Sequence, residues 1–303
     1  MHSVSGLNQC YGIAGQVNFI RDAHGFDLVE VTNAQATARL ALQGAQLLHW
    51  APVGQQSAIW VSDQAIYAPG KPVRGGAPVC WPWFGPHESR TDFPAHGFAR
   101  NQLWEIVSVV ALPDGSTQLS LRLPGQEGTA ELWPHDTALD MELTIGKHLK
   151  VDLVTRNLGD QPVTVGQALH TYFHIGDIRQ VSILGLEGCP YVDKVRHGER
   201  HVQAGEIRFE QETDRIYLDS TRDVVIHDPV LGRRIHIAKK GSASTVVWNP
   251  WLEKATAMKD LGADGYTHMV CVENANAADD VRILPAGSSH RMEVCYTVAM
   301  ETP

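Results

Sequence analysis

The residues best suited to acid–base chemistry are a histidine and a glutamate that lie far apart in the sequence. His170 lies in segment 169–173, beside aromatic side chains that could form one wall of a cleft. Glu273 follows the apolar run 268–272, so a strand would deliver its carboxylate to a loop face where neighbouring amides could orient it. Taken alone, each is more often structural: a hydrogen-bonded histidine or a solvated acid at a strand end.

Two arginines are candidates for binding an anion. Arg74 precedes two glycines, where missing side chains would let a ligand approach the backbone and leave N–H groups free. Arg100 ends segment 94–100, and in an extended chain its even spacing from His96 would put both side chains on one face. Guanidinium groups offer forked donors, so the pair would suit a phosphate dianion. The alternative is that both arginines form ordinary surface ion pairs.

Tryptophans accompany these charged groups. Trp81 and Trp83 lie between the two arginines, and Trp248 and Trp251 flank a short loop with Asn249. Indole faces often pack against the C–H face of a pyranose in concave sugar sites, with polar neighbours for its hydroxyl groups. We therefore take Trp83, Trp248 and Asn249 as candidate sugar contacts, although core packing explains each tryptophan equally well.

Several cofactor and metal signatures are missing from the sequence. There is no dinucleotide-binding G-x-G-x-x-G after a strand, no P-loop, no G-x-S-x-G and no H-E-x-x-H. His170 and His174 have a spacing that could share one ion on a helix, but their flanks are strand-like. On an extended strand the two rings would lie roughly 13 Å apart, too far for one zinc ion. We expect no metal and no cofactor.

The elements that must position these groups are β-strands. Val, Ile, Leu and Thr recur with the alternation of strands in residues 28–32, 104–112, 117–123, 139–145, 149–155, 181–186, 224–227, 234–238 and 291–299. Turn residues at 113–116 and 157–160 predict hairpins between successive strands. The pattern predicts an all-β fold, a large antiparallel β-sandwich.

One short helix is predicted over 250–261. Asn249 would be its N-cap, Pro250 its first residue, and Gly262 would follow its end. No linker, repeat or low-complexity tract divides the chain, so we expect residues 1–303 to form a single domain with one or two short helices.

Charge and cysteine content narrow the partners and the compartment. The 25 Lys and Arg against 34 Asp and Glu give a net charge of −9, which repels nucleic acid and anionic membranes at long range. Any bound anion must therefore be held by local groups. The five cysteines are dispersed without a C-x-x-C pair, and neither a signal peptide nor a long apolar span is evident. We expect a reduced, cytoplasmic monomer that binds neither nucleic acid nor membranes.

Six segments in series resemble those of a known family: KPVRGGAPVCWPWFG at 71–85, HGFAR at 96–100, LHTYF at 169–173, TDRIY at 213–217, VWNP at 247–250 and VEN at 272–274. Together they resemble the glucose-6-phosphate 1-epimerase, or hexose-6-phosphate mutarotase, branch of the aldose 1-epimerase superfamily. The resemblance implies an antiparallel β-sandwich of the galactose mutarotase type. By position it also implies roles for six residues: His170 as acid, Glu273 as base, His96 as a second ring-oxygen contact, Asp214 as a sugar-hydroxyl ligand, and Arg74 and Arg100 as phosphate ligands.

The function implied is cofactor-independent interconversion of the α and β anomers of a hexose 6-phosphate, with glucose 6-phosphate as the expected small-molecule substrate. A free-sugar aldose 1-epimerase would share His170 and Glu273 but would not need the two arginines. A non-catalytic carbohydrate-binding protein would keep the aromatic residues and bind without exchanging anomers. A glycosidase normally uses two carboxylates across one bond, and the one plausible partner of Glu273 is Asp214.

Overall fold

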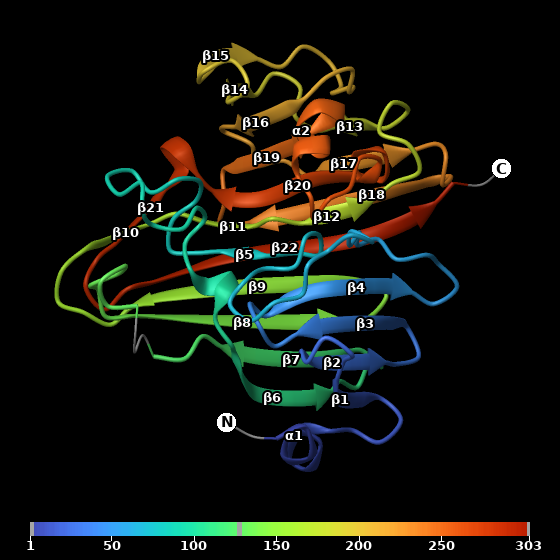
Figure 1. Cartoon of the computed structure of the whole chain (residues 1–303), viewed down its shortest axis with the longest axis vertical. Helices are drawn as coiled ribbons and strands as arrows, with labels where there is room; N and C mark the ends of the chain where they lie inside the picture. Colours follow the sequence, from blue (N-terminus) through green and yellow to red (C-terminus); the bar gives the residue numbers. More distant parts are fainter. Residues whose placement is uncertain (1–2, 126–128, 302–303) are drawn as a thin grey trace.

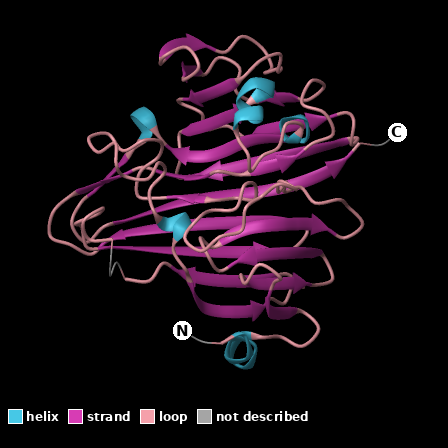
Figure 2. Cartoon of the chain, in the orientation of Figure 1, coloured by secondary structure: helices cyan, strands magenta, loops and turns pink. Residues whose placement is uncertain are grey.

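The computed structural model describes residues 3–125 and 129–301, which form two packed layers of antiparallel β-sheet (Figure 1). Strands dominate the chain, and the helices are short pieces at its edges and in its loops (Figure 2). The predicted all-β fold is therefore confirmed. No helix in these described ranges is long and apolar enough to cross a membrane.

The first layer contains the eight-stranded sheet to which most of the candidate residues belong. Its strands are β5 (Val79–Cys80), β11 (Gln167–Leu169), β12 (Tyr172–His174), β14 (Pro190–Asp193), β15 (Glu199–Val202), β16 (Thr213–Tyr217), β19 (Ser244–Asn249) and β20 (Met269–Asn276). They run in the order β15-β14-β16-β19-β20-β11-β5, and β12 also pairs with β20. Because β20 joins β19 on one side to β11 and β12 on the other, it is the centre of this sheet.

A four-stranded sheet extends the first layer. Its strands β1 (Val17–Arg21), β2 (Asp27–Thr32), β3 (Ala36–Ala41) and β4 (Gln46–Pro52) lie in sequence order. A bridge between Leu47 and Ala77 ties this sheet to the chain that leads into β5. In Figure 1 these blue strands overlie the green strands of the second layer, and the Trp50 indole N–H donates across to the carbonyl of Gly146.

The second layer is an eight-stranded sheet of order β13-β17-β18-β22-β9-β8-β7-β6, made from β6 (Glu105–Ala111), β7 (Thr117–Arg122), β8 (Thr137–Ile145), β9 (His148–Asn157), β13 (Ser182–Leu184), β17 (Val224–Asp228), β18 (Arg233–Lys240) and β22 (Ser289–Met300). A separate pair joins β10 (Val163–Val165) to β21 (Arg282–Leu284). The helices are α1 (Val4–Tyr11), α2 (Trp251–Ala257) and the 3-10 turns Ala99–Asn101, Gly265–His268 and Ala278–Asp280.

The main core lies between the two layers and follows from strand alternation. Val270 and Val272 of β20 belong to the same buried cluster as Val294 and Tyr296 of β22. The Trp81 indole N–H also donates to Thr155 Oγ1 of β9 at 3.1 Å, which links the layers through a polar contact. Since successive strand residues face opposite sides, the odd-numbered residues of β20 face away from this core.

The predicted hairpins had different outcomes. The 113–116 turn does connect the antiparallel pair β6 and β7, with Gly115 at φ +87°. The 157–160 turn does not make a hairpin, because β9 pairs with β8 and β22 whereas β10 pairs with β21. Its Asn157 side chain instead donates to the carbonyls of Gln161, Leu284 and Pro285, which holds the chain as it leaves the sheet.

The predicted helix at 250–261 is shorter than expected. α2 ends at Ala257, and its N-cap position is Pro250 rather than Asn249. The Asn249 side chain nevertheless accepts from the Trp251 N–H at 2.9 Å, so it holds the entrance to the helix. The α1 helix was not predicted; its Ser3 N-cap hydroxyl accepts from the Gly6 N–H.

Candidate active site

A cavity of about 560 Å³ opens on the face of the first eight-stranded sheet that points away from the second layer. Glu273 and Val246 line it, whereas their neighbours Val272 and Val247 pack into the core between the layers. The lining includes seven of the nine predicted site residues: Arg74, His96, Arg100, His170, Asp214, Trp248 and Glu273. Residues from distant parts of the sequence therefore meet at one hollow.

The register of the sheet explains one row of these side chains. Asp214 on β16 lies opposite Trp248 on β19. Cys271 on β20 lies opposite Trp248 on one side and Tyr172 of β12 on the other. Because directly opposite residues in an antiparallel ladder project to the same face, these four side chains form a row, in which Asp214, Trp248 and Tyr172 line the cavity and Cys271 is buried beneath it.

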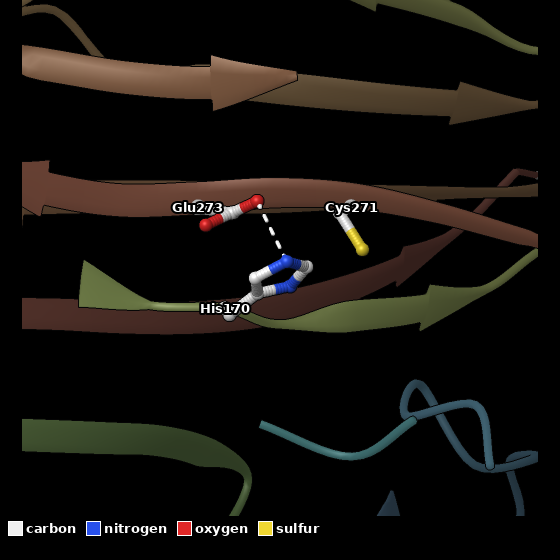
Figure 3. A group of neighbouring side chains, drawn as sticks. All are labelled: His170, Cys271 and Glu273. Atoms are coloured by element: carbon white, nitrogen blue, oxygen red, sulfur yellow. Dashed lines mark ion pairs between the residues drawn. The ribbon is translucent and has the colours of Figure 1, made fainter. Parts of the chain in front are cut away.

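His170 lies between β11 and β12, directly across from Glu273. Leu169 pairs with Asn274 before the gap and Tyr172 pairs with Cys271 after it, so the register is unchanged and His170 faces Glu273. In the gap the backbone leaves the ladder, and the His170 N–H donates to the Pro78 carbonyl at 2.9 Å. The His170 Nε2 and Glu273 Oε1 atoms lie 3.4 Å apart, and a dashed line joins the two side chains in Figure 3.

Glu273 does not lie at a strand end, contrary to the sequence-based expectation. β20 continues through Asn276, and Asn274 points to the other face, where its amide bonds to the Glu293 carbonyl. The neighbouring amides therefore do not orient the carboxylate. Glu273 is 1 % exposed, and its Oε2 has no hydrogen-bond partner among the described residues. Burial raises the pKa of its carboxyl well above the usual value, with Asp214 adding to the shift.

Aromatic rings fix the position of the His170 ring. It stacks on Tyr172 with centroids 4.9 Å apart, and the edges of Trp248 and His96 lie at 5.8 and 5.7 Å. Burial, helped by the charges of nearby cations, lowers the pKa of His170 well below its ordinary value. In the free cavity the uncharged forms of both His170 and Glu273 are therefore favoured.

His96 is held in one tautomer by a backbone contact. The Gly85 N–H donates to its Nδ1 at 3.3 Å, so in the neutral ring the proton lies on Nε2. Burial, with Arg100 and Lys194 adding to it, lowers the pKa of His96 to about 3. His96 therefore stays neutral near pH 7 and offers an N–H donor.

The 96–100 segment is not extended, so the predicted reason for the meeting of His96 and Arg100 is wrong. His96 has φ +67°, and Arg100 lies in the 3-10 turn Ala99–Asn101. The turn folds both side chains into the cavity lining. Arg100 Nη2 donates to the Ala95 carbonyl, its buried Nε has no partner, and no carboxylate of the described residues forms an ion pair with it.

Arg74 is also in the cavity lining but already has two partners. Its Nη2 lies 3.1 Å from the Asp260 carboxylate, and its Nη1 donates to the Tyr172 hydroxyl at 3.0 Å. The second of the two following glycines does not offer a free N–H group as expected, because the Gly76 N–H donates to the Trp60 carbonyl. Glycine is needed there for packing: a Cβ on Gly76 would lie 2.4 Å from the Leu47 carbonyl oxygen.

Positive charge exceeds negative charge around the cavity. The ionisable residues in the lining, histidines and Tyr172 aside, are five cations and three carboxylates: Lys71, Arg74, Arg100, Lys194 and Lys254 against Asp214, Asp260 and Glu273. With all three carboxylates ionised this is a local surplus of two positive charges, five minus three, in a chain whose net charge is −9, and the surplus is larger when Glu273 is protonated. A cavity with this balance attracts an anion that the rest of the surface repels.

The sequence from residue 27 to residue 297 matches the model of a protein family described as aldose 1-epimerase. The chain belongs to the aldose 1-epimerase family. It is thus an enzyme of the isomerase class that acts on sugars.

Relatives of this epimerase carry related names. It is 39 % identical over 265 residues to an Escherichia coli K12 protein named "Putative glucose-6-phosphate 1-epimerase", covering 87 % of this chain and 88 % of that protein. A crystal structure described as a "putative mutarotase" from Salmonella typhimurium superposes with a TM-score of 0.89 at 34 % identity, covering 96 % of each chain. A galactose mutarotase related enzyme from Lactobacillus acidophilus shares the fold alone, at 14 % identity and a TM-score of 0.71 over 90 % of this chain and 97 % of that one.

Two residues predicted as sugar contacts do not line the cavity of this epimerase. The Trp83 indole N–H donates to the Pro94 carbonyl, and its ring packs against Phe93 and Phe98. The Asn249 amide is fully buried and donates to the carbonyls of Tyr266 and Met269. Both side chains hold loops near the site, so their predicted contact with a sugar is not supported by the geometry.

Sequence reasoning missed the lysines and the acid that complete the epimerase cavity. Lys194 Nζ lies 3.5 Å from Asp214 Oδ2, and Lys254 Nζ bonds to Glu212 at 2.6 Å. Asp260, the partner of Arg74, follows α2. Single lysines and aspartates occur throughout the sequence, so only the spatial convergence distinguishes these residues from ordinary surface charges.

Proposed function

We propose that this aldose 1-epimerase family member interconverts the α and β anomers of hexose 6-phosphates, with glucose 6-phosphate as its expected substrate. The observation that carries the proposal is the cavity itself, where a histidine and a glutamate 3.4 Å apart share the lining with a surplus of cations. The name given to the Escherichia coli relative agrees with it.

The reaction requires one proton to leave the substrate and another to reach it. In the proposed ring opening, the Glu273 carboxylate takes the proton of the C1 hydroxyl while His170 gives a proton to the ring oxygen. The bond from C1 to the ring oxygen breaks, C1 becomes an aldehyde carbon and the ring oxygen becomes a hydroxyl. Rotation about C1–C2 and the reverse proton transfers close the ring as the other anomer, so no electron donor or acceptor is consumed.

Burial determines which protonation states of His170 and Glu273 are favoured in the free enzyme. It favours neutral His170 and protonated Glu273, whereas ring opening uses protonated His170 and ionised Glu273. Both forms hold the same number of protons, and a proton can cross the 3.4 Å between Nε2 and Oε1 when a bound phosphate dianion favours positive charge on His170. The pair should therefore titrate as one unit with shared apparent pKa values.

His96 has a different proposed role from His170. Its Nε2–H can donate a hydrogen bond to the ring oxygen and stabilise negative charge that develops there. With its pKa lowered to about 3, His96 carries no extra proton to transfer near pH 7. We therefore assign it a contact to the ring oxygen and leave proton delivery to His170.

The two arginines are proposed to bind the 6-phosphate unequally. Arg100 has no carboxylate partner among the described residues, so its guanidinium is free for the dianion. Arg74 shares its charge with Asp260 and is held in place by Tyr172. We propose Arg100 as the main phosphate ligand, Arg74 as the second, and Asp214 as a ligand of a sugar hydroxyl.

The decisive experiment compares glucose 6-phosphate with glucose in one assay of anomer exchange, by NMR saturation transfer or polarimetry. A site built around cations rejects the analogue that lacks the phosphate, by up to about 10⁴ in kcat/KM. Equal turnover of both sugars would support a free-sugar epimerase instead. Binding of glucose 6-phosphate without acceleration of exchange would support a non-catalytic sugar-binding protein.

A further inference from the structure

Two side chains that line the cavity, His170 and Glu273, and the fully buried Cys271 beside them have the chemistry of ligands for a transition metal. Cys271 and Glu273 are two residues apart on β20 and therefore project to the same face, and His170 lies opposite Glu273. A nitrogen, a sulfur and an oxygen from these residues lie within 4.8 Å of one another (Figure 3). This set is distinct from the His170 and His174 pair that the strand spacing argues against.

The distances are close to those that zinc requires. Zinc bonds of about 2.0 Å to nitrogen or oxygen and about 2.3 Å to sulfur place tetrahedral ligand atoms roughly 3.5 Å apart. The separation of 3.4 Å between His170 Nε2 and Glu273 Oε1 already fits. The longest separation in the group, at most 4.8 Å, has to shorten by roughly 1 Å, which is a small side-chain movement.

Two buried atoms of the group also lack partners. Glu273 Oε2 and His170 Nδ1 make no hydrogen bond to any described residue. A buried polar atom without a partner costs about 1–3 kcal/mol, so a ligand that satisfies one of them is favoured. These are not the Nε2 and Oε1 atoms that lie 3.4 Å apart, so an ion held by Nε2 and Oε1 satisfies one of them only after the carboxylate or the ring rotates.

We infer that His170, Cys271 and Glu273, at and just beneath the cavity floor, form an inhibitory binding site for a thiophilic divalent cation, Zn²⁺ in the first instance. Binding breaks the Cys271 S–H bond and the O–H bond of protonated Glu273, forms a metal–thiolate and a metal–carboxylate bond, and releases two protons to solvent. The bound ion occupies both proposed proton-transfer groups, so anomer exchange stops. The inference goes beyond the proposed function, which needs no metal.

The ligand set decides which cations bind at this site. The cavity's surplus of positive charge repels every dication, and Mg²⁺, which prefers oxygen ligands, gains no thiolate bond that would offset this repulsion. Zinc bound to one thiolate and one carboxylate forms a group with no net charge, because two negative ligands balance the ion. Selectivity for soft cations therefore follows from the Cys271 sulfur.

The test measures anomer exchange against free Zn²⁺ in phosphate-free buffer, for wild type, Cys271→Ser and a matched control, Cys189→Ser. Cys189 is also buried but lies outside the group. Each rate is normalised to the same variant without metal. Wild type and Cys189→Ser should be inhibited reversibly, with activity restored by a chelator, and Cys271→Ser should need about tenfold more Zn²⁺ or higher. Equal sensitivity of wild type and Cys271→Ser overturns the inference.

A spectroscopic measurement tests metal binding at this site independently of the proposed epimerase activity. Co²⁺ bound to a thiolate gives a ligand-to-metal charge-transfer absorption band, and we expect this band in wild type. An excess of Zn²⁺ should abolish the band by displacing Co²⁺, and the Cys271→Ser variant should not show it. Mg²⁺ should leave the band unchanged. This readout needs no catalysis, so a protein without epimerase activity still tests the metal site. If Cys271→Ser does not fold, Cys271→Ala replaces it, and absence of the band in wild type overturns the inference.

Discussion

The outer faces of the two large sheets differ in how their charged side chains are buried and paired. On the outer face of the second sheet, charged residues pair across neighbouring strands near solvent: Arg122 and Arg156 both contact Asp140, and Lys150 contacts Glu293. On the outer face of the first sheet, Glu273 and His170 are buried under the cavity and each has an atom without a partner. The exposed charges of the second sheet are paired with one another, although the buried Asp152 Oδ1 and Arg233 Nε there also have no partner among the described residues; in the first sheet the atoms without a partner include those of the two proposed proton-transfer groups.

This difference indicates where selection acts on stability and where it acts on chemistry. Exposed ion pairs contribute about 0–1 kcal/mol each and are easily replaced. A buried carboxyl with a raised pKa and no partner for one oxygen destabilises the fold, and such groups cluster where proton transfer occurs. We therefore expect substitutions on the first sheet to lower activity strongly, and those on the second to have little effect on it.

The largest expected effect is the loss of a proton-transfer group. Glu273→Gln and His170→Asn should each lower kcat/KM for glucose 6-phosphate by about 10²–10⁴, because positioned acid–base groups contribute that much. Circular dichroism and thermal unfolding check that each variant is folded. A near-normal exchange rate in either variant removes that residue from the proposed mechanism.

The next largest effect is expected on substrate binding, from the loss of the Arg100 guanidinium. Arg100→Met should raise KM for glucose 6-phosphate by about 10–100-fold, because hydrogen bonds between charged groups contribute about 1.5–3 kcal/mol. The effect on kcat should be smaller, since Arg100 does not touch the proposed reacting atoms.

Glucose serves as the internal control for Arg100→Met, because it has no phosphate. Its slow exchange should be the same with wild type and with the variant. An equal loss for both sugars would show that Arg100 supports the structure of the site rather than the phosphate.

The sequence predicts the sheets better than it predicts the site geometry. Hydrophobic alternation places β8, β9 and β22 within a few residues of their bounds, because each has one face in the core between the layers. It fails at 273–276, where polar residues are buried on both faces of β20 and continue the sheet. Polar composition alone cannot distinguish a loop from a strand that holds a site.

The candidate site could be predicted in part, and only through resemblance. Matching segments indicated His170, Glu273 and Arg100, but the reasons inferred from local spacing were wrong for Arg100 and for Gly76 after Arg74. The place of Cys271 beside this pair depends on the register between strands distant in sequence. Such a register is set by the whole fold, so no local pattern reveals it.

A smaller effect is expected on the stability of the fold. Burial raises the pKa of Glu273, so the native state binds its proton more tightly than the unfolded chain does. That contribution is fully present below the unfolded pKa, about 4.3, and is lost as pH rises through the folded pKa. Glu273→Gln should therefore unfold like wild type near pH 4 and be more stable at neutral pH, by about 1–3 kcal/mol. Denaturant titrations at several pH values measure this difference, and equal stability at neutral pH would contradict it.

The smallest effect is expected on the second sheet, where Asp140→Asn breaks two ion pairs at once. Because the Arg122 side chain is half-exposed and the Arg156 side chain partly so, we expect a loss of unfolding free energy of about 1 kcal/mol or less, smaller still at high salt. The exchange rate with glucose 6-phosphate should not change, since Asp140 lies in the layer opposite the cavity. A fall in rate comparable to that of Glu273→Gln would contradict this expectation. It would show that a charge on the outer face of the second sheet controls proton transfer on the first.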